Sequence, residues 1–403
     1  MKLLRTPALL GALLGALLAL LTAPVTAQVL CGIDVLARDQ GGLLRGKNLG
    51  LVTNHTGMAR DGRRTIDVLR ALPEVHLRAI FSPEHGLQGT LDRDGIVHGQ
   101  DEASGLPVWS LYGETRKPTA EMLKDIDTIV FDIQDIGCRF YTYVSTMGEC
   151  LEAAAELDKT FVVLDRPNPI GGVAMAGPIL DEGKESFVGW HRLPVRHGMT
   201  AGELMRMFVG ERGIRVEAKV VACEGWSRGD TYDRTGLAWI DPSPNMRSLT
   251  EALLYPGIGL LEGTNLSVGR GTDTPFERLG APWCSGVRLA ELLREQNLAG
   301  VAFVPIRFTP TASKFEGKEC HGIQIAITDW KTFEPVTTGI AIATALRKLH
   351  RDDWNTEKLG WLLKSELTQK AILDGEDART IAKSWLKDLE VFRMRRKPFL
   401  LYL

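Results

Sequence analysis

The sequence predicts an α/β protein with a Rossmann-like, doubly wound and mostly parallel sheet, followed by a second, smaller α/β or α+β domain. Two observations support this fold class. Up to about residue 245, short apolar runs alternate with helix-like segments, which is typical of strand–helix–strand units in a parallel sheet. Beyond that point, two strand-like runs precede three helical segments. We therefore expect a Rossmann-like domain over residues 28–247 and a C-terminal domain over residues 248–403.

The first domain is expected to contain short buried strands separated by amphipathic helices. Thr200 and Glu203 stand at capping-box spacing, which indicates the start of one helix. No GxGxxG sequence is present, so nothing in the chain supports dinucleotide binding. The predicted strands cover 48–54, 75–82, 127–135, 160–169 and 215–223, and the predicted helices cover 63–72, 142–158 and 199–212.

The second domain is predicted from a different arrangement of the same kinds of segment. An apolar run before "EGTNLSVGRGT" (262–272) is interpreted as a strand that ends in a polar, glycine-rich loop. Two further strands and three helices are expected after it. The strands cover 301–310 and 322–330, and the helices cover 336–350, 357–365 and 379–391.

Residues 1–27 have the pattern of a cleaved secretory signal peptide. Lys2 and Arg5 precede an uncharged apolar run, and Val25-Thr26-Ala27 fits the small-x-small cleavage pattern. The apolar run is short for a membrane span, which makes a membrane anchor the weaker alternative. We therefore expect a periplasmic or secreted protein without stable membrane insertion after signal cleavage.

Charge and cysteine content exclude several classes of partner. The chain has a formal net charge of −2, and its mature part is slightly more acidic because the signal carries two basic residues. A weakly acidic chain without a basic run is unsuited to nucleic acid or anionic membranes. The six cysteines form no CxxC pair or zinc-spaced cluster, so neither a structural zinc nor any other metal site is predicted. Six cysteines allow fifteen disulfide pairings, and the sequence does not choose among them.

Polar residues follow the predicted strands repeatedly. In open α/β sheets, ligands bind in the crevice at the carboxyl ends of the strands, so these residues predict a lined cleft. Tyr141 and His197 stand in nearby loops and are further candidates, although Tyr141 also suits the core. The strand-end residues are Asn54, His55, Ser82, Glu84, His85, Asp132, Gln134, Asp135, Arg139, Asp165, Arg166 and Asn168, with Glu262, Asn265 and Arg270 in the second domain.

Among these candidates, Glu84 is the one whose presence is hardest to explain by a purely structural role. By contrast, Asp165 could simply pair with Arg166 or Arg139. Pro83 holds the backbone before Glu84 extended, and apolar Phe81 and Leu87 flank it. A carboxyl group in such surroundings tends to keep its proton and can act as an acid.

Three kinds of chemistry fit these residues to different degrees. Nucleophilic serine catalysis needs an elbow such as GxSxG, which is absent. A metal-dependent hydrolase could use His85, Asp132, Asp135 and His197, but no HxH or HExxH pair supports it. Glycosidic cleavage needs a protonated acid and a second group, and strand-end carboxylates suit it. The residues favour a glycosidase over a metal hydrolase, and both over an esterase.

Several long motifs resemble those of one bacterial family. In the same order as in that family, the chain contains "GLVTNHTG", "FSPEHGLQG", "FDIQDIGCRFYTYVSTM", "VLDRPNPIGG", "PVRHGMTAGEL", "PSPNM" and "LLEGTNLSVGRGTDTPFE". It resembles the NamZ-like exo-β-N-acetylmuramidases, once catalogued only as a domain of unknown function. The resemblance covers nearly all of the chain after Gly32. It implies a Rossmann-like catalytic domain, a smaller C-terminal domain and an active site in the cleft between them.

The resemblance also implies a reaction: removal of a terminal, non-reducing β-1,4-linked N-acetylmuramic acid from peptidoglycan fragments, in cell-wall turnover, without a dissociable cofactor. Glu84 occupies the position of the family's favoured catalytic residue. Asp135, Asp165 or Glu262 would be the second group. Two alternatives remain, a metal-dependent hydrolase of cell-wall material and a non-catalytic muropeptide-binding protein. The residues expected to bind the saccharide are Asn54, His55, His85, Gln134, Arg139, Tyr141, Asp165, Arg166, Asn168, His197, Asn265 and Arg270.

Overall fold

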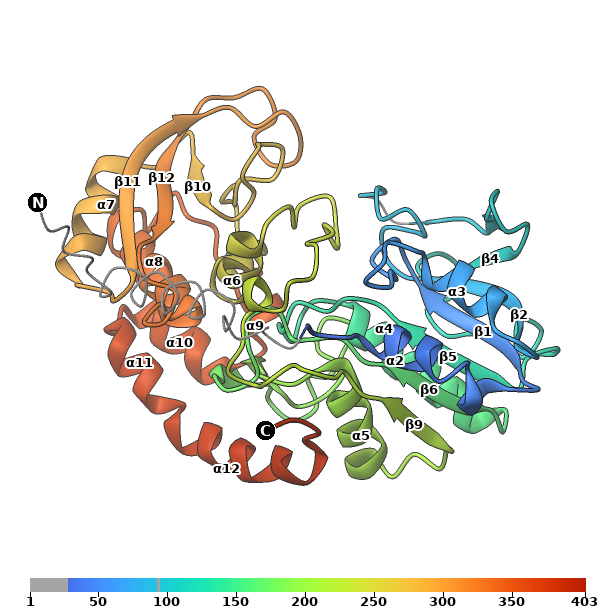
Figure 1. Cartoon of the computed structure of the whole chain (residues 1–403). Helices are drawn as coiled ribbons and strands as arrows, with labels where there is room; N and C mark the ends of the chain where they lie inside the picture. Colours follow the sequence, from blue (N-terminus) through green and yellow to red (C-terminus); the bar gives the residue numbers. More distant parts are fainter. Residues whose placement is uncertain (1–27, 93–94) are drawn as a thin grey trace, which may run out of the picture.

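A seven-stranded sheet forms the centre of the N-terminal domain in the computed structural model, which describes residues 28–92 and 95–403 (Figure 1). The predicted signal peptide, residues 1–27, lies outside the described residues. The strand order is β3-β4-β2-β1-β5-β6-β9, and only the pairing of β3 with β4 is antiparallel. The strands are β1 (Asn48–Thr53), β2 (His76–Ser82), β3 (Gly99–Gln100), β4 (Pro107–Ser110), β5 (Thr128–Asp132), β6 (Thr160–Leu164) and β9 (Ala218–Val221).

This strand order confirms the predicted doubly wound topology. The chain runs from β1 outward to β2 and β4, and then returns to β5 on the other side of β1. The topological switch therefore lies between β1 and β5, where the carboxyl-end loops diverge and leave room for a ligand. The loops after β2, β4 and β5 all open at this edge of the sheet.

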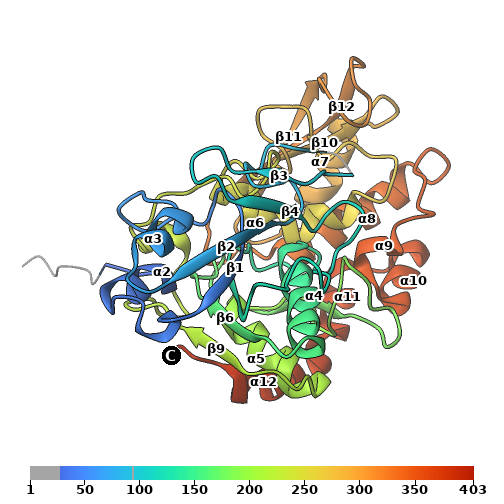
Figure 2. The same cartoon turned by 90° about the vertical axis from the view of Figure 1, so that its right-hand side faces the viewer.

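Helices cover both faces of the sheet, as Figure 2 shows. Side chains alternate along each strand, so Val130 packs with the core under one layer of helices, whereas Ile129 and Phe131 pack with the core under the other. One layer contains α2 (Gly32–Arg38) and α3 (Thr65–Ala71), and the other contains α4 (Tyr143–Glu156) and α5 (Ala201–Arg212). The capping box predicted at Thr200 and Glu203 is present at the start of α5.

The second domain combines a small antiparallel sheet with a group of helices, as predicted. Its strand order is β10-β12-β11. Helices α6 and α8 cross closely because Gly257 and Gly339 meet there: a Cβ added to Gly339 would lie 2.3 Å from the Gly257 carbonyl oxygen. The elements are β10 (Arg278–Ala281), β11 (Val301–Phe308), β12 (Cys320–Ile327), α6 (Leu249–Ile258), α7 (Gly286–Glu295), α8 (Pro335–Leu349), α9 (Gly360–Leu363), α10 (Glu366–Asp374), α11 (Ala378–Ser384) and α12 (Leu386–Arg396).

One predicted strand is wrong. The apolar run before Glu262 forms helix α6 and a 3-10 turn, Gly259–Leu261. Ser248 and Glu251 form a capping box that starts this helix. The helix is buried on nearly all sides, so its sequence lacks the amphipathic pattern that distinguishes a helix from a strand. The predicted helix 379–391 is also divided, at Trp385, into α11 and α12.

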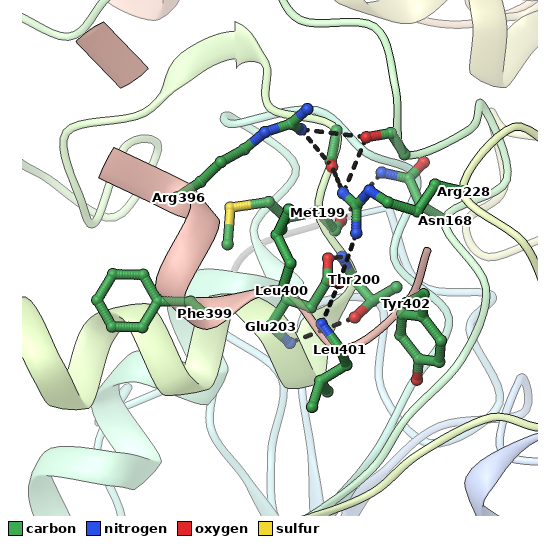
Figure 3. A network of polar contacts seen from close by, with 12 residues as sticks. Asn168, Met199, Thr200, Glu203, Arg228, Arg396, Phe399, Leu400, Leu401 and Tyr402 are labelled. Atoms are coloured by element: carbon green, nitrogen blue, oxygen red, sulfur yellow. Dashed lines mark hydrogen bonds and ion pairs between the residues drawn. The ribbon is translucent and has the colours of Figure 1, made fainter. Parts of the chain in front are cut away.

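The end of the chain returns to the N-terminal domain (Figure 3). The Tyr402 hydroxyl donates to Asp165 Oδ2 at 2.5 Å, and Glu203 Oε1 accepts from the Leu401 amide at 2.9 Å and from Arg228 at 2.5 Å. Arg396, at the end of α12, donates to the Gly198 carbonyl at 2.7 Å. These buried contacts join the last residues of the second domain to β6 and α5 of the first.

Two further features are the state of the cysteines and the character of the helices. All six cysteines are buried and carry free thiols. Within residues 28–92 and 95–403, no helix is both long and apolar enough to cross a membrane.

Candidate active site

A cavity of about 480 Å³ lies where the carboxyl-end loops of the sheet face the second domain. Glu84 and His85 contribute to it from the loop after β2, and Tyr141, Thr142 and Tyr143 from the loop before α4 and its first turn. The second domain closes the other side with Tyr255, Glu262, Arg270, Phe276, Trp361 and Leu362. Five of the predicted site residues line this cavity: Glu84, His85, Tyr141, Glu262 and Arg270.

The loop that carries Glu84 is a tight turn held in an uncommon conformation. His85 has a φ of +69°, a value that non-glycine residues adopt rarely and that tends to persist at functional sites. The His85 Nδ1 atom donates to the Leu91 carbonyl at 2.6 Å, which closes the turn. Gly89 has to be glycine, because a Cβ there would lie 1.8 Å from the His55 ring. The turn thus directs Glu84 into the cavity and gives His85 and His55 supporting roles.

Glu84 is half-buried, and among the described residues one side chain, at the start of α4, forms a hydrogen bond with it. Its Oε2 atom accepts a hydrogen bond from the Thr142 hydroxyl. Thr142 is the residue just before α4, so the position of Glu84 depends on the loop after β5 as well as on its own turn. Within residues 28–92 and 95–403, no hydrogen bond engages the other carboxylate oxygen, which leaves it to a ligand in the cavity.

Glu262 is the second carboxylate lining the cavity that the sequence predicted, and it is already neutralised. Arg270 Nε donates to Glu262 Oε1 at 2.5 Å, and Arg270 Nη1 lies 3.6 Å from Asp92 Oδ2. The Glu262 side chain is only 12% exposed. A charged partner this close restricts the movement of the Glu262 side chain. Held in this way by Arg270, Glu262 presents its carboxyl group to the cavity in a fixed position.

Asp135 lies close to Tyr141 but does not itself line the cavity. Its Oδ2 atom accepts from the Gly137 amide at 2.7 Å, whereas its buried Oδ1 atom has no hydrogen-bond partner among the described residues. Burial raises the pKa of Asp135 to about 7, against the opposing effect of the Gly137 and Ile136 amides. A buried carboxyl without full hydrogen bonding costs stability, and such costs are common at functional sites.

His197 accompanies Asp135 in the same buried region. Its Nε2 atom lies 3.7 Å from Asp135 Oδ2. Burial, followed by the charges of Arg396, Arg139 and Arg196, lowers the pKa of His197 to about 3. His197 is therefore neutral at physiological pH, and its Nδ1 atom accepts from the Met199 amide at 3.2 Å. It supports the loop around Asp135 and does not reach the cavity.

Replacing Asp135 with asparagine is expected to stabilise the protein at pH 8 more than at pH 4. Because the folded-state pKa is raised above the ordinary 3.8, the folded form holds its proton more tightly, and stability is lost as pH rises through about 7. Asparagine removes this loss, for a gain on the order of a few kcal/mol at pH 8. Denaturant unfolding at both pH values measures it. Exposed Asp125→Asn is the control, and an equal effect of Asp135→Asn at both pH values would contradict the prediction.

Three charged residues predicted to bind substrate lie outside the cavity, where they make structural contacts. Arg139 is 1% exposed, and its guanidinium donates to the carbonyls of residues 178, 193, 362 and 363, which tie the two domains together. Arg166 forms an ion pair with Asp132 at 2.5 Å. Asp165 accepts hydrogen bonds from Thr200, Gly202 and Tyr402. None of the three lines the cavity. The pairing of Asp165 with Arg166 or Arg139, considered from the sequence, is also not formed.

The predicted amide and histidine ligands outside the cavity hold loops together. Asn54 Oδ1 accepts from the Thr56 amide, Gln134 Nε2 donates to the Pro167 carbonyl, and Asn168 Nδ2 donates to the Met199 carbonyl. His55 Nε2 donates to the Asp241 carbonyl at 2.6 Å. Asn265 contacts the backbone of residues 353 and 355 within the second domain. These residues shape the loops around the cavity without lining it.

Several residues that line the cavity were not predicted from the sequence, among them Tyr112, Arg116 and Phe187. Tyr112 and Arg116 follow β4, a four-residue strand whose apolar pattern is too short to be recognised. Phe187 lies between β7 (Ala176–Ile179) and β8 (Pro194–Arg196), in a segment with no periodicity. The signal for Tyr112 and Arg116 would have been the strand itself, since polar residues after its end fall at the same sheet edge as Glu84.

Fold and cavity together define a two-domain α/β enzyme with an acidic residue in the cleft between a Rossmann-like domain and a smaller domain. Family models of the exo-β-N-acetylmuramidase NamZ match the chain, the N-terminal model over residues 49–250 and the C-terminal model over residues 253–402. The chain belongs to the NamZ family, which confirms the resemblance seen in its motifs and the prediction of a glycoside hydrolase.

Individual relatives agree with this membership. The chain is 42% identical over 379 residues to the peptidoglycan β-N-acetylmuramidase NamZ of Bacillus subtilis (strain 168), covering 93% of this chain and 92% of that protein. A crystal structure of a DUF1343 family protein from Bacteroides fragilis matches with a TM-score of 0.86 at 38% identity, over 93% of this chain and 99% of that one. A second DUF1343 protein from the same organism matches with a TM-score of 0.77 at 32% identity, again over 93% and 99%.

Proposed function

We propose that this protein is an exported, exo-acting glycoside hydrolase that releases terminal, non-reducing β-1,4-linked N-acetylmuramic acid from peptidoglycan fragments, in cell-wall turnover and recycling. The observation that carries the proposal is the position of Glu84: the acid of the "SPEHG" motif is held by Thr142 inside the interdomain cavity. The 42% identity to a peptidoglycan β-N-acetylmuramidase supports the substrate. Export rests on the sequence of residues 1–27 alone.

The size of the cavity supports exo action. Its volume of about 480 Å³ falls in the lower half of the range for small-molecule sites, roughly 300–1,000 Å³. A cavity of this size suits one terminal sugar with its substituents better than a continuous glycan strand. Its aromatic walls, Tyr141, Tyr255 and Phe276, provide apolar faces for a sugar ring.

In the proposed reaction, Glu84 donates its proton to the glycosidic oxygen as the bond to the anomeric carbon breaks. Positive charge then develops at the anomeric centre. Glu262 lines the same cavity, so its carboxyl group can stabilise that charge directly. Asp135 does not line the cavity but lies close to Tyr141, which does, so it can stabilise the charge from a longer distance. Both remain proposed catalytic residues, whereas the buried Asp165 is no longer proposed as the second group, because three hydrogen bonds hold it away from the cavity.

The metal-hydrolase alternative has less support from the geometry. Asp132, one of its four suggested ligands, is committed to Arg166. Within the described ranges 28–92 and 95–403, no group of three or more His, Cys, Asp or Glu side chains is arranged to hold a metal ion.

Product analysis tests the proposal directly. The protein is incubated with a disaccharide in which N-acetylmuramic acid is the non-reducing end, and with the isomer in which N-acetylglucosamine occupies that end. We expect free N-acetylmuramic acid from the first substrate only, detected by mass spectrometry, with turnover unchanged after exhaustive chelation. Saturable binding without product would instead support a muropeptide-binding protein, and loss of turnover on chelation would support the metal hydrolase.

A further inference from the structure

Two guanidinium groups line the cavity, and their charges are engaged to very different extents. Arg270 contacts two carboxylates, at 2.5 Å from Glu262 and 3.6 Å from Asp92. Arg116 has no ion pair with any of the described residues. Arg116 is therefore the cavity-lining cation whose charge is available to an incoming anion.

Aromatic rings hold the Arg116 guanidinium in place. Its Cζ atom lies 4.0 Å from the centroid of the Phe187 ring and 5.2 Å from that of Tyr112. A guanidinium stacked on a ring keeps its edge free, and that edge carries the N–H groups that bind a carboxylate as a fork. Stacking thus restricts the side chain without using its hydrogen-bond donors, which reduces the entropy lost on binding.

The backbone on both sides of this contact is also fixed. The Thr115 hydroxyl donates to the Lys117 carbonyl at 2.7 Å, and the Lys117 ammonium pairs with Glu156 of α4 at 2.5 Å. Opposite it, Ser186 and Gly189 exchange two backbone hydrogen bonds, of 3.1 and 2.9 Å, that close the turn carrying Phe187. Arg116 and Phe187 therefore meet as a built contact at the wall of the cavity.

The sheet places this contact in the same cavity as the proposed acid. Strands β2 and β4 are parallel neighbours, and Ser82 pairs with Ser110. Glu84 follows Ser82 by two residues, and Arg116 follows Ser110 by six, so both loops leave the same edge of the sheet into one cavity. A sugar bound in this cavity with its glycosidic oxygen at Glu84 therefore has Arg116 in the wall around it, where a ring substituent can meet the guanidinium.

We propose that Arg116, stacked on Phe187, determines specificity by binding the carboxylate of the lactyl ether that distinguishes N-acetylmuramic acid from N-acetylglucosamine. This inference rests on the proposed function and assigns the recognition of the negative charge to one residue. Arg139 and Arg166 were also expected to bind the saccharide, but their guanidinium groups are occupied, by backbone carbonyls and by Asp132 respectively. Arg270 remains next to Glu262, where it holds that carboxylate.

The test compares two chromogenic substrates that differ only in the lactyl group, a β-N-acetylmuraminide and a β-N-acetylglucosaminide. In Arg116→Met, which keeps an apolar side chain against Phe187, the selectivity ratio of the two kcat/KM values is expected to fall about 10- to 100-fold, the effect of losing a hydrogen bond to a charged group. Arg116→Lys should restore part of the ratio. A muraminide whose lactyl group is a neutral carboxamide should be discriminated against by wild type and not by Arg116→Met.

Arg212→Met is the matched control, because it removes another guanidinium that lies over a ring, 3.8 Å from the centroid of Trp190, outside the cavity. Its selectivity ratio should equal that of wild type. An unchanged ratio in Arg116→Met overturns the assignment of Arg116 but leaves the proposed function intact. If wild type releases neither chromophore, the proposed function fails. In that case, calorimetry with free N-acetylmuramic acid and N-acetylglucosamine tests the role of Arg116, because it needs no turnover. Equal affinities for the two sugars would overturn the assignment of Arg116.

Discussion

Glu84→Gln is expected to lose nearly all turnover of a chromogenic β-N-acetylmuraminide while folding normally. Glutamine has the shape of glutamic acid and can still accept from the Thr142 hydroxyl, but it cannot supply a proton. Loss of a general acid typically costs about 10²- to 10⁴-fold in rate. Initial rates give the effect, and thermal unfolding confirms that the variant is folded.

The leaving group shows whether Glu84 acts as the acid. A dinitrophenyl leaving group needs little protonation, so the loss in Glu84→Gln should be much smaller with it than with a poor leaving group. Glu114→Gln, an exposed change on the loop after β4, is the control and should behave as wild type. Near wild-type turnover of the poor substrate by Glu84→Gln would refute the assignment of Glu84.

Arg166→Met is expected to destabilise the protein by about 3–5 kcal/mol, the usual effect of removing one partner of a buried ion pair. Asp132 is fully buried and accepts two hydrogen bonds from Arg166, at 2.5 and 2.9 Å, and one from Thr65. Without Arg166 its carboxylate stays buried with the Thr65 hydroxyl as its remaining side-chain partner among the described residues. The free energy of unfolding from denaturant titration measures the effect.

Two further variants make this prediction specific. Arg166→Met combined with Asp132→Asn removes both charges and should recover part of the lost stability. Arg63→Met breaks an ion pair with Asp61 in which both side chains are more than half exposed, and it should cost at most about 1 kcal/mol. Equal losses from Arg166→Met and Arg63→Met would mean that the buried pair contributes no more than a surface pair.

The architecture was predictable because its signals are local. The strands β1, β2, β5 and β6 are apolar runs bounded by loop residues, and α5 begins at a capping box that the sequence displays. Prediction fails where the environment of a segment removes the sequence pattern that its secondary structure usually shows. Helix α6 is apolar all round because it is buried, so its sequence resembles a strand.

The site was less predictable, because arginines with the same sequence setting have different partners in space. Arg139 and Arg116 both follow strands at the edge that carries the cavity. Arg139 is taken up by carbonyls of residues 39 to 224 positions further along the chain, whereas Arg116 faces the cavity beside Phe187. Only the tertiary structure brings residues 178, 193, 362 and 363 to one point, and no spacing in the sequence records it.

A chain leaves the ribosome N-terminus first, so Tyr402 is synthesised 237 residues after Asp165, its hydrogen-bond partner. Until then Asp165 lacks the Tyr402 hydroxyl, and Glu203 lacks the Leu401 amide. The N-terminal domain can therefore complete its own polar contacts only after the second domain has been synthesised. A nascent chain that stalls before residue 401 carries a first domain with two buried carboxyl groups short of partners, and it is exposed to unfolding and proteolysis for as long as it waits.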